Sequence, residues 1–399
     1  MKKKSNNIKQ HLLQHRQYWT KWAHVIGIVA VALILTRFTI YNISSLSVFA
    51  PLDKEMDFEM SDFYNLVTDN KTIIRDISQE IVIVGVDGLS RREVIDIINT
   101  VSDCGPRAIG LDIYFTFPEE NNAYFLKTLS ETPNLVCSES VIMEEDRIHY
   151  RRQSLSFYQS DINPKAGYVN LNTENAQHVV RTFRPYVTSS TNDTLYSMPY
   201  MLASIANKEK VQQLLSTNPN EVIIDYTSYC IDTIHAKNID EYAKKEFKDK
   251  IILIGDMKDL SDSYITPVSG VKPGVMIHAL ELQTILSGKY IRVSGAWFNW
   301  LMAVVVCLIY VSLLLFSKYH MIDYGSLVLR VGQFLVIFLM IYVGCIVYKY
   351  QHFYIDFSPG VLMLGLGSLA FDIWFGLYAL AKQIKEKIRV FIYNKSHKK

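Results

Sequence analysis

The sequence lacks the residue patterns that carry metal chemistry or nucleophilic catalysis. Its five cysteines form no Cys-x-x-Cys pair and have no histidine at metal-ligand spacing, which argues against a zinc site and against a disulfide scaffold. No Gly-x-Ser-x-Gly or His-Glu-x-x-His motif occurs, and neither VGVDG nor LIGD completes the glycine series of a dinucleotide-binding loop. We therefore predict that the protein is not an enzyme, has no obligate cofactor and binds no nucleic acid.

Acidic residues are scarce at both ends of the chain. Residues 1–21 carry six Lys or Arg and no acid, and residues 379–399 carry seven with one Glu. Residues 43–295 instead carry 24 basic and 35 acidic side chains, a net charge of −11. The chain is therefore basic at its ends and acidic in its main globular part.

Hydrophobic residues make up 49% of the chain, which indicates membrane spans in addition to a core. A bilayer takes about 20 mostly apolar residues per helix, so we expect one span at 22–42 and three between 296 and 380. Short basic flanks stay in the cytoplasm, which puts 1–21 and 381–399 inside and 43–295 outside a cell inner (cytoplasmic) membrane. The first apolar run could instead be a cleaved secretory signal.

The basic segment 381–399 is predicted to belong to an amphipathic helix. Leu380, Ile384, Ile388 and Phe391 recur at helical spacing among lysines, which is typical of a helix on the anionic inner leaflet. We expect no cytoplasmic output domain after it. A receptor of this plan would act through a separate effector protein.

The segment 43–295 alternates short apolar runs with amphipathic stretches. IVIVGVD (81–87), RAIGLDIYF (107–115) and NLVCSES (134–140) are typical of strands, whereas 91–105 and 122–132 are typical of helices. This order predicts an α/β fold with a parallel, Rossmann-like sheet covered by helices. The later segments are predicted as a β-rich, hairpin-like insertion of GYVNL and VVRTFRPYV, a helix at 195–215, the strands EVIIDY and KIILIGD, and the helix GVMIHALELQTILSG.

These stretches resemble the extracellular sensory domain of the second CHASE class, CHASE type 2. The likeness covers about residues 81–292 and is most specific in GDMKDLSDSYITPVSGVKPGVMIHAL, with its Gly-Asp, Asp, Thr-Pro, Pro-Gly and His-Ala series. It extends to one membrane span before the domain and three after it. Two loops depart from the family pattern, since GLSRREVIDII has no Trp-Pro-rich stretch and TENAQHVVRTF has no Asp-Gly pair. The resemblance implies a receptor that senses an extracytoplasmic signal.

Acidic residues end three of the predicted strands. Asp87, Asp112 and Asp256 follow apolar runs, and the carboxyl ends of parallel strands meet at the edge where such sheets bind ligands. With Asp259 and Asp262 they could hold Mg²⁺ or Ca²⁺ through oxygen ligands. The alternative is structural, because Asp after a strand also caps helices and turns.

Thr266 and His278 complete this predicted rim. Thr266-Pro267 and Pro273-Gly274 are expected to fix a loop before the last helix, because Pro restricts its own φ and the residue before it. His278 falls on the first turns of that helix. It is expected to be packed and hydrogen-bonded, and a ligand role or a pH-reporting role is left open.

Two further expectations concern charged and thiol side chains. Asp372 lies within the last apolar stretch, where a carboxylate costs about 2.5 to 3.5 kcal/mol, so it needs a partner. Arg330 is the candidate, with a basic group on another subunit as the alternative. Cys104, Cys137 and Cys230 of the globular part are expected to be buried small hydrophobes, with one disulfide left open.

Two function classes follow from the sequence. The first is a membrane-anchored sensor that binds an extracytoplasmic ligand or protein and acts through a separate effector. The second is a non-sensing docking or structural subunit of a membrane complex. Both imply an unidentified partner in addition to the lipid bilayer, and a homo-oligomer is compatible with either.

Overall fold

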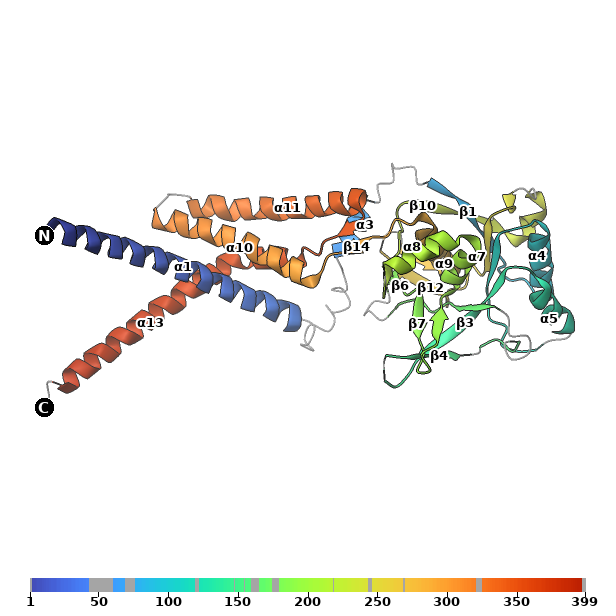
Figure 1. Cartoon of the computed structure of the whole chain (residues 1–399), viewed down its shortest axis with the longest axis horizontal. Helices are drawn as coiled ribbons and strands as arrows, with labels where there is room; N and C mark the ends of the chain where they lie inside the picture. The colour runs from blue at the N-terminus through green and yellow to red at the C-terminus, as the bar shows by residue number, and fades with distance from the viewer. Residues whose placement is uncertain are drawn as a thin grey trace. The chain divides into compact units, whose positions relative to one another are not determined.

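The computed structural model describes residues 2–42, 60–68, 76–118, 122–146, 148–153, 155–158, 165–173, 179–217, 219–242, 246–267, 270–320 and 325–396. The chain divides into two compact units, a helical unit of Met1–Met60 with Arg292–Lys399 and an α/β unit of Ser61–Ile291. Figure 1 shows the elements of both units. Residues 43–59, at the start of the predicted exterior segment 43–295, and residues 174–178, within TENAQHVVRTF, lie outside the described residues.

The α/β unit is built on a seven-stranded sheet in the order β10-β1-β11-β2-β3-β4, with β5 beside β3. Every pair is parallel except β3 with β4. Strand β11 lies between β1 and β2, so segments that are far apart in the sequence lie side by side in the sheet. The strands are β1 (Asp76–Gly85), β2 (Ala108–Asp112), β3 (Leu135–Met143), β4 (Tyr150–Gln153), β5 (Ala166–Tyr168), β10 (Tyr229–His235) and β11 (Ile251–Gly255).

Helices cover both faces of this sheet. Alternate strand residues point to opposite faces, so Ile81 and Ile83 pack with one set of helices and Val82 and Val84 with the other. The first set is α7 (Met198–Ala206), α8 (Lys208–Ser216) and α9 (Gly274–Ser287), and the second is α4 (Arg91–Asp103) and α5 (Asn122–Glu131). In Figure 1 these two sets lie apart within the α/β unit. The predicted mixed α/β class with a parallel sheet is confirmed.

Local sequence signals fix the first crossover helix. Ser90 accepts a hydrogen bond from the backbone N–H of Glu93, and the Glu93 carboxylate accepts one from the backbone of Ser90. Gly105 follows the helix with φ of 71°, a conformation that L side chains rarely adopt. Helix α4 therefore begins and ends close to where its sequence predicts.

The predicted β-rich hairpin is wrong in its pairing. GYVNL joins the main sheet as β5, while β6 (Thr182–Phe183) pairs with β9 (Val222–Ile223) and β7 (Tyr186–Thr188) with β8 (Thr194–Tyr196). The helix predicted at 195–215 is likewise two helices, because Asn207 ends α7 and its side chain caps α8. Elements not predicted include two strands of the main sheet, β4 and β10, together with α3 (Met60–Thr68), the 3₁₀ helix η2 (Ala236–Glu241), and the hairpin β12 (Ser263–Thr266) with β13 (Gly270–Pro273).

In the helical unit, three helices among the described residues are long and apolar enough to cross a membrane. These candidate spans are Thr20–Ile40 within α1 (Lys2–Asn42), α10 (Ala296–Tyr319), and Leu327–Gln351 within α11 (Gly325–Gln351). The short strands β14 (Arg292–Val293) and β15 (Phe353–Tyr354) pair in parallel.

The last apolar stretch is not the single helix predicted from the sequence. It consists of α12 (Ser358–Gly365) and α13 (Gly367–Ser396), which meet at an angle of 45° and can count as one broken span. Gln333 on α11 donates a hydrogen bond of 3.3 Å to the carbonyl of Gly365 at the break, which satisfies an acceptor that the helix releases there. Helix α13 then runs on without a second break as far as Ser396, so the described part of the basic tail is not a separate helix.

Close packing joins the first and last helices. The indole of Trp374 on α13 lies where a Cβ on Gly27 of α1 would stand, and its Nε1 donates to Nδ1 of His24 at 3.0 Å. Only glycine allows this approach.

No disulfide joins any of the five cysteines, all of which lie within the described residues, and Cys137 is buried as expected. Cys230 is exposed, so the expectation of burial is wrong for that thiol.

Candidate functional site

The predicted rim divides into two groups. Asp87 and Asp256 follow the neighbouring strands β1 and β11 and share a hydrogen bond. Asp87 also accepts from the backbone N–H of Met257 at 2.5 Å and lies 3.6 Å from Nε2 of His235. Burial opposes the charged form of Asp87, but the hydrogen bonds from Asp256 and Met257 lower its pKa overall. Burial and the shared bond with Asp87 raise the pKa of Asp256.

Asp256 and Asp259 accept hydrogen bonds within turns. Asp256 accepts hydrogen bonds from the backbone N–H groups of Lys258 and Asp259 at 2.7 and 3.0 Å. Asp259 accepts from the backbone and hydroxyl of Ser261, and Thr266 donates to the carbonyl of Gly270 across the β12–β13 turn. These contacts support the structural interpretation of Asp256, Asp259 and Thr266, in which their side chains stabilise turns.

The second group is a cluster of charged side chains beneath the N-terminus of α9. His278 and Glu281, both buried, lie one turn apart on α9, and Nδ1 of His278 is 2.9 Å from Oε2 of Glu281. Burial alone would lower the pKa of His278, but Glu281, followed by Asp112 and Asp262, raises it to about 9. Burial raises the pKa of Asp112 to about 6. One imidazolium therefore lies among three carboxyl groups.

Asp262 explains the glycine that begins α9. A Cβ on Gly274 would stand 2.5 Å from Oδ2 of Asp262, and the Gly274 N–H donates to the Asp262 carbonyl at 2.9 Å. The carboxylate thus lies at the positive end of the helix dipole. Among the residues that the structure describes, no group of three or more His, Cys, Asp or Glu side chains is arranged to hold a metal ion.

A cavity of about 160 Å³ lies at the far end of the sheet, away from the predicted residues. Its walls come from β3, β4, β5 and the segment after it, the loop between β6 and β7, and β7. The lining residues are Val141, Met143, Tyr150, Tyr168, Asn170, Leu171, Asn172, Arg184 and Val187. Several of them also form a small hydrophobic cluster that is separate from the two main cores.

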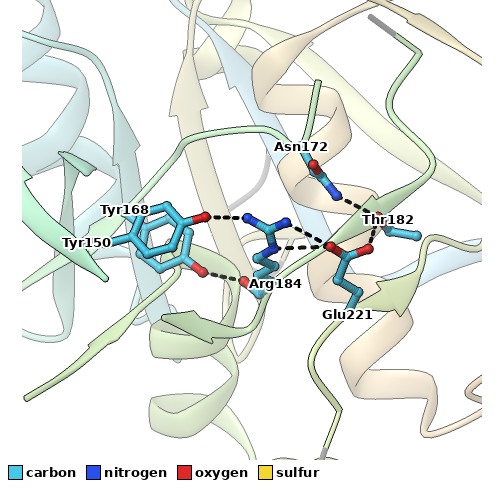
Figure 2. Close-up of polar contacts among 6 residues, drawn as sticks. All are labelled: Tyr150, Tyr168, Asn172, Thr182, Arg184 and Glu221. Atoms are coloured by element: carbon cyan, nitrogen blue, oxygen red, sulfur yellow. Dashed lines mark hydrogen bonds and ion pairs between the residues drawn. The ribbon is translucent and has the colours of Figure 1, made fainter. Parts of the chain in front are cut away.

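Arg184 organises the polar side of this cavity, as Figure 2 shows. Its Nε and Nη2 donate to Oε1 of Glu221 at 3.1 and 2.9 Å, and its Nη1 donates to the hydroxyl of Tyr150 at 2.5 Å. The hydroxyl of Tyr168 donates to the Arg184 carbonyl. Both the side chain and the backbone of Arg184 are therefore held from several sides.

A buried ion pair lies three residues before Arg184. Nε and Nη2 of Arg181 donate to the two carboxylate oxygens of Asp62 on α3 at 2.8 and 2.7 Å. Side-chain exposure is 8% for Arg181 and 11% for Asp62. The pair fastens α3, the first described element after the first candidate span, to the strands beside the cavity.

The ion pairs of Arg181 with Asp62 and of Arg184 with Glu221 were not predicted, and neither was the cavity. The available signal was VVRTFRPYV, in which two arginines three residues apart interrupt an otherwise apolar run. A charged side chain in such a run needs a partner. The partners, Asp62 and Glu221, lie 119 and 37 residues away, and no spacing rule connects them.

In the helical unit, Nη2 of Arg330 on α11 lies 3.3 Å from Oδ2 of Asp372 on α13. Both side chains are more than half exposed in the isolated chain, at 52% and 61%. Nearby, the hydroxyl of Tyr310 on α10 donates to Oε1 of Gln333 at 2.6 Å, and both residues are buried. Polar contacts thus join α10, α11, α12 and α13.

In a comparison with protein-family models, a model described as CHASE2 domain matches residues 38–315. This range includes the whole α/β unit and most of α10. No curated protein and no solved structure matches the chain.

Proposed function

Because the chain belongs to the CHASE2 family of extracellular sensory domains and carries apolar helices that suit a membrane anchor, we propose that it is a receptor acting through a separate effector. The family is sensory and not catalytic. In this proposal the α/β unit receives a signal outside the inner membrane, both termini are cytoplasmic, and the membrane helices pass the signal to a partner. The basic ends and the acidic middle of the chain support this orientation.

The observation that carries the proposal is the anchoring of both segments that lead to candidate spans. Helix α3 follows the first span and is fastened to the α/β unit by the Asp62–Arg181 pair. Helix α9 precedes α10 and is buried along almost its whole length. Only residues 288–295 separate its end from the start of α10. A rearrangement of the sheet would therefore move two chain segments that continue into the membrane helices.

Helix α13 offers the partner a surface. Ile384, Ile388 and Phe391 recur at intervals of four and three residues, and all three are exposed. This spacing is that of a seam which packs against another helix. Leu377 and Ala381 continue the same pattern toward the span. We propose that the effector contacts this seam.

Affinity purification from the native membrane tests the proposal. We expect the tagged full-length chain to retain a fixed effector in mild detergent and to lose it in Ile388→Asp. Lys387→Asp, on the neighbouring position outside the seam, is the matched control and should retain the effector. A chain that purifies alone in every mild detergent, or that loses the effector equally in both variants, would contradict the proposal.

The second candidate function is a non-sensing docking subunit, and one surface favours it. Ile265 and Val271 are opposite each other on the β12–β13 hairpin, both are exposed, and the nearby Leu260 is 90% exposed. Exposed apolar groups of this kind mark protein contact surfaces. If Leu260→Ser abolishes assembly while the effector's activity never responds to external compounds, the docking function replaces the sensory one.

A further inference from the structure

We propose that the cavity lined by Tyr150, Tyr168 and Arg184 binds a neutral hydroxylated ring of monosaccharide size. This inference rests on the proposed sensory function and supplies the class of ligand. It concerns the cavity alone, and the acidic residues of the predicted rim have no part in it.

The size of the cavity limits the ligand. A volume of about 160 Å³ is close to that of a cavity that holds one six-membered ring. Nucleotides and peptides of several residues are larger. A single ring with small substituents fits the space.

The charges at the cavity favour a neutral ligand. Arg184 is the cation of the lining, and Glu221 neutralises it through two hydrogen bonds to one carboxylate oxygen. A ligand anion would have to compete with Glu221, and a ligand cation would face the guanidinium. Burying an uncompensated charge is costly, so the arrangement selects against charged compounds.

Two asparagines offer complementary polar groups. Oδ1 of Asn170 accepts from the backbone N–H of Val141 at 2.7 Å, which leaves its amide NH2 as a donor. Nδ2 of Asn172 donates to Oγ1 of Thr182 at 2.8 Å, which leaves its carbonyl oxygen as an acceptor (Figure 2). A hydroxyl group donates and accepts, so a hydroxylated ring satisfies both amides.

The remaining walls are apolar. Val141, Leu171 and Val187 provide aliphatic surface, and the two tyrosines provide aromatic rings. The C–H faces of a sugar ring pack on such surfaces while its rim of hydroxyls reaches the polar groups. This division matches the lining of the cavity.

The cavity also lies where a ligand can affect the segments that lead to the membrane. Arg184 is three residues from Arg181, whose guanidinium holds Asp62 on α3. The phenol of Tyr168 lies close enough to Glu281 on α9 for the carboxylate to add to the effect of burial in raising the pKa of Tyr168. A ligand that fixes Tyr168 and Arg184 therefore acts next to both helices.

Binding of simple sugars to the purified full-length chain tests the inference. D-glucose, D-galactose and D-ribose are titrated by calorimetry, with D-glucuronate as the charged control and phenol as the apolar control. We expect at least one neutral sugar to bind and to raise the unfolding temperature by mass action. Absence of binding by all three sugars, or tighter binding of glucuronate or phenol, would overturn the inference.

Variants assign the binding to the cavity. Asn172→Ala should weaken sugar affinity at least tenfold. Asn99→Ala changes a half-buried asparagine on α4 that does not line the cavity, and it should leave the affinity unchanged. Met143→Trp puts a larger side chain into the cavity at a partly exposed position. If Asn172→Ala does not fold, the sugar affinity of Met143→Trp shows whether the sugar binds in the cavity. Equal affinity in the wild type and Met143→Trp contradicts the inference. If no sugar binds but the effector still co-purifies, only the ligand class fails and the proposed function stands.

Discussion

Arg181 and Asp62 form a two-point ion pair that is almost fully removed from solvent, with hydrogen bonds of 2.8 and 2.7 Å. Removing one member of such a pair leaves an uncompensated buried charge, which costs about 3–5 kcal/mol. We expect Asp62→Asn to lower the unfolding free energy of the α/β unit by that amount. Thermal and urea unfolding of the full-length chain measure the loss.

The surface pair Glu80–Arg107 supplies the control for this prediction. Its side chains are 39% and 33% exposed, so Glu80→Gln should cost at most about 1 kcal/mol. Equal losses for Asp62→Asn and Glu80→Gln would mean that the Asp62–Arg181 pair does not fasten α3 to the α/β unit.

The second prediction concerns the effect of Asp112 on how the unfolding free energy depends on pH. Burial raises its pKa from 3.8 to about 6, so the folded state binds a proton more tightly than the unfolded chain does. Its contribution to stability is therefore present at low pH and is lost as the pH rises through 6. Asp112→Asn should gain stability relative to the wild type between pH 4 and 6, by at most about 3 kcal/mol.

Unfolding at a series of pH values measures this difference. Asp259 is the control, because its hydrogen bonds from Ser261 lower its pKa below the ordinary value of 3.8. The difference between Asp259→Asn and the wild type should therefore stay nearly constant from pH 4 to 7 and shrink only below about pH 4. A difference between Asp112→Asn and the wild type that stays constant from pH 4 to 7 would show that burial does not raise the pKa of Asp112.

The third prediction tests the contact between α1 and α13. A methyl group at Gly27 would collide with the Trp374 indole, so Gly27→Ala should separate the helices and lower the melting temperature of the detergent-solubilised chain. A Cβ added at Gly332 on α11 would have no neighbouring atom within 4 Å. Gly332→Ala should therefore leave the melting temperature unchanged or raise it, because alanine has a higher helix propensity than glycine. The reverse order of the two variants would contradict the packing.

The fourth prediction concerns Arg330 and Asp372, which are 3.3 Å apart. If each is the other's partner, either single change to alanine leaves a charge uncompensated in or near the bilayer, and the double change should restore most of the lost stability. Melting temperatures of the four chains form the cycle. Additive losses would indicate that Asp372 has another partner, such as a basic group on the effector.

The sequence predicts the centre of the α/β unit better than its periphery. Ile81–Val84 and Ile251–Ile254 form continuous apolar runs that identify buried parallel strands, and the Ser90 and Gly105 signals mark α4. The strands of two or three residues in β5 to β9 carry no such periodicity, and their partners are chosen by tertiary contacts. Asn207 shows the same limit, because a single cap divides an otherwise helical pattern.

The candidate site was predicted only in part. The acidic residues after strands are visible because each ends an apolar run, and the structure brings Asp87 to Asp256 and Asp112 to His278 and Asp262. The cavity escaped prediction because its polar side chains come from three separate segments. Their convergence depends on how β4, β5 and β7 pair, which the local sequence does not determine.

In the proposed topology the α/β unit faces the outside and the end of α13 faces the cytoplasm. Cys230 is a free and exposed thiol on the α/β unit, and the other cysteines are buried or half-buried. Treating intact cells with a membrane-impermeant maleimide should therefore label the wild type, and Cys230→Ser should abolish the label. With Cys230→Ser as background, Lys387→Cys on α13 should be labelled only after the cells are permeabilised. Labelling of Lys387→Cys in intact cells, with Cys230 protected, would contradict the account.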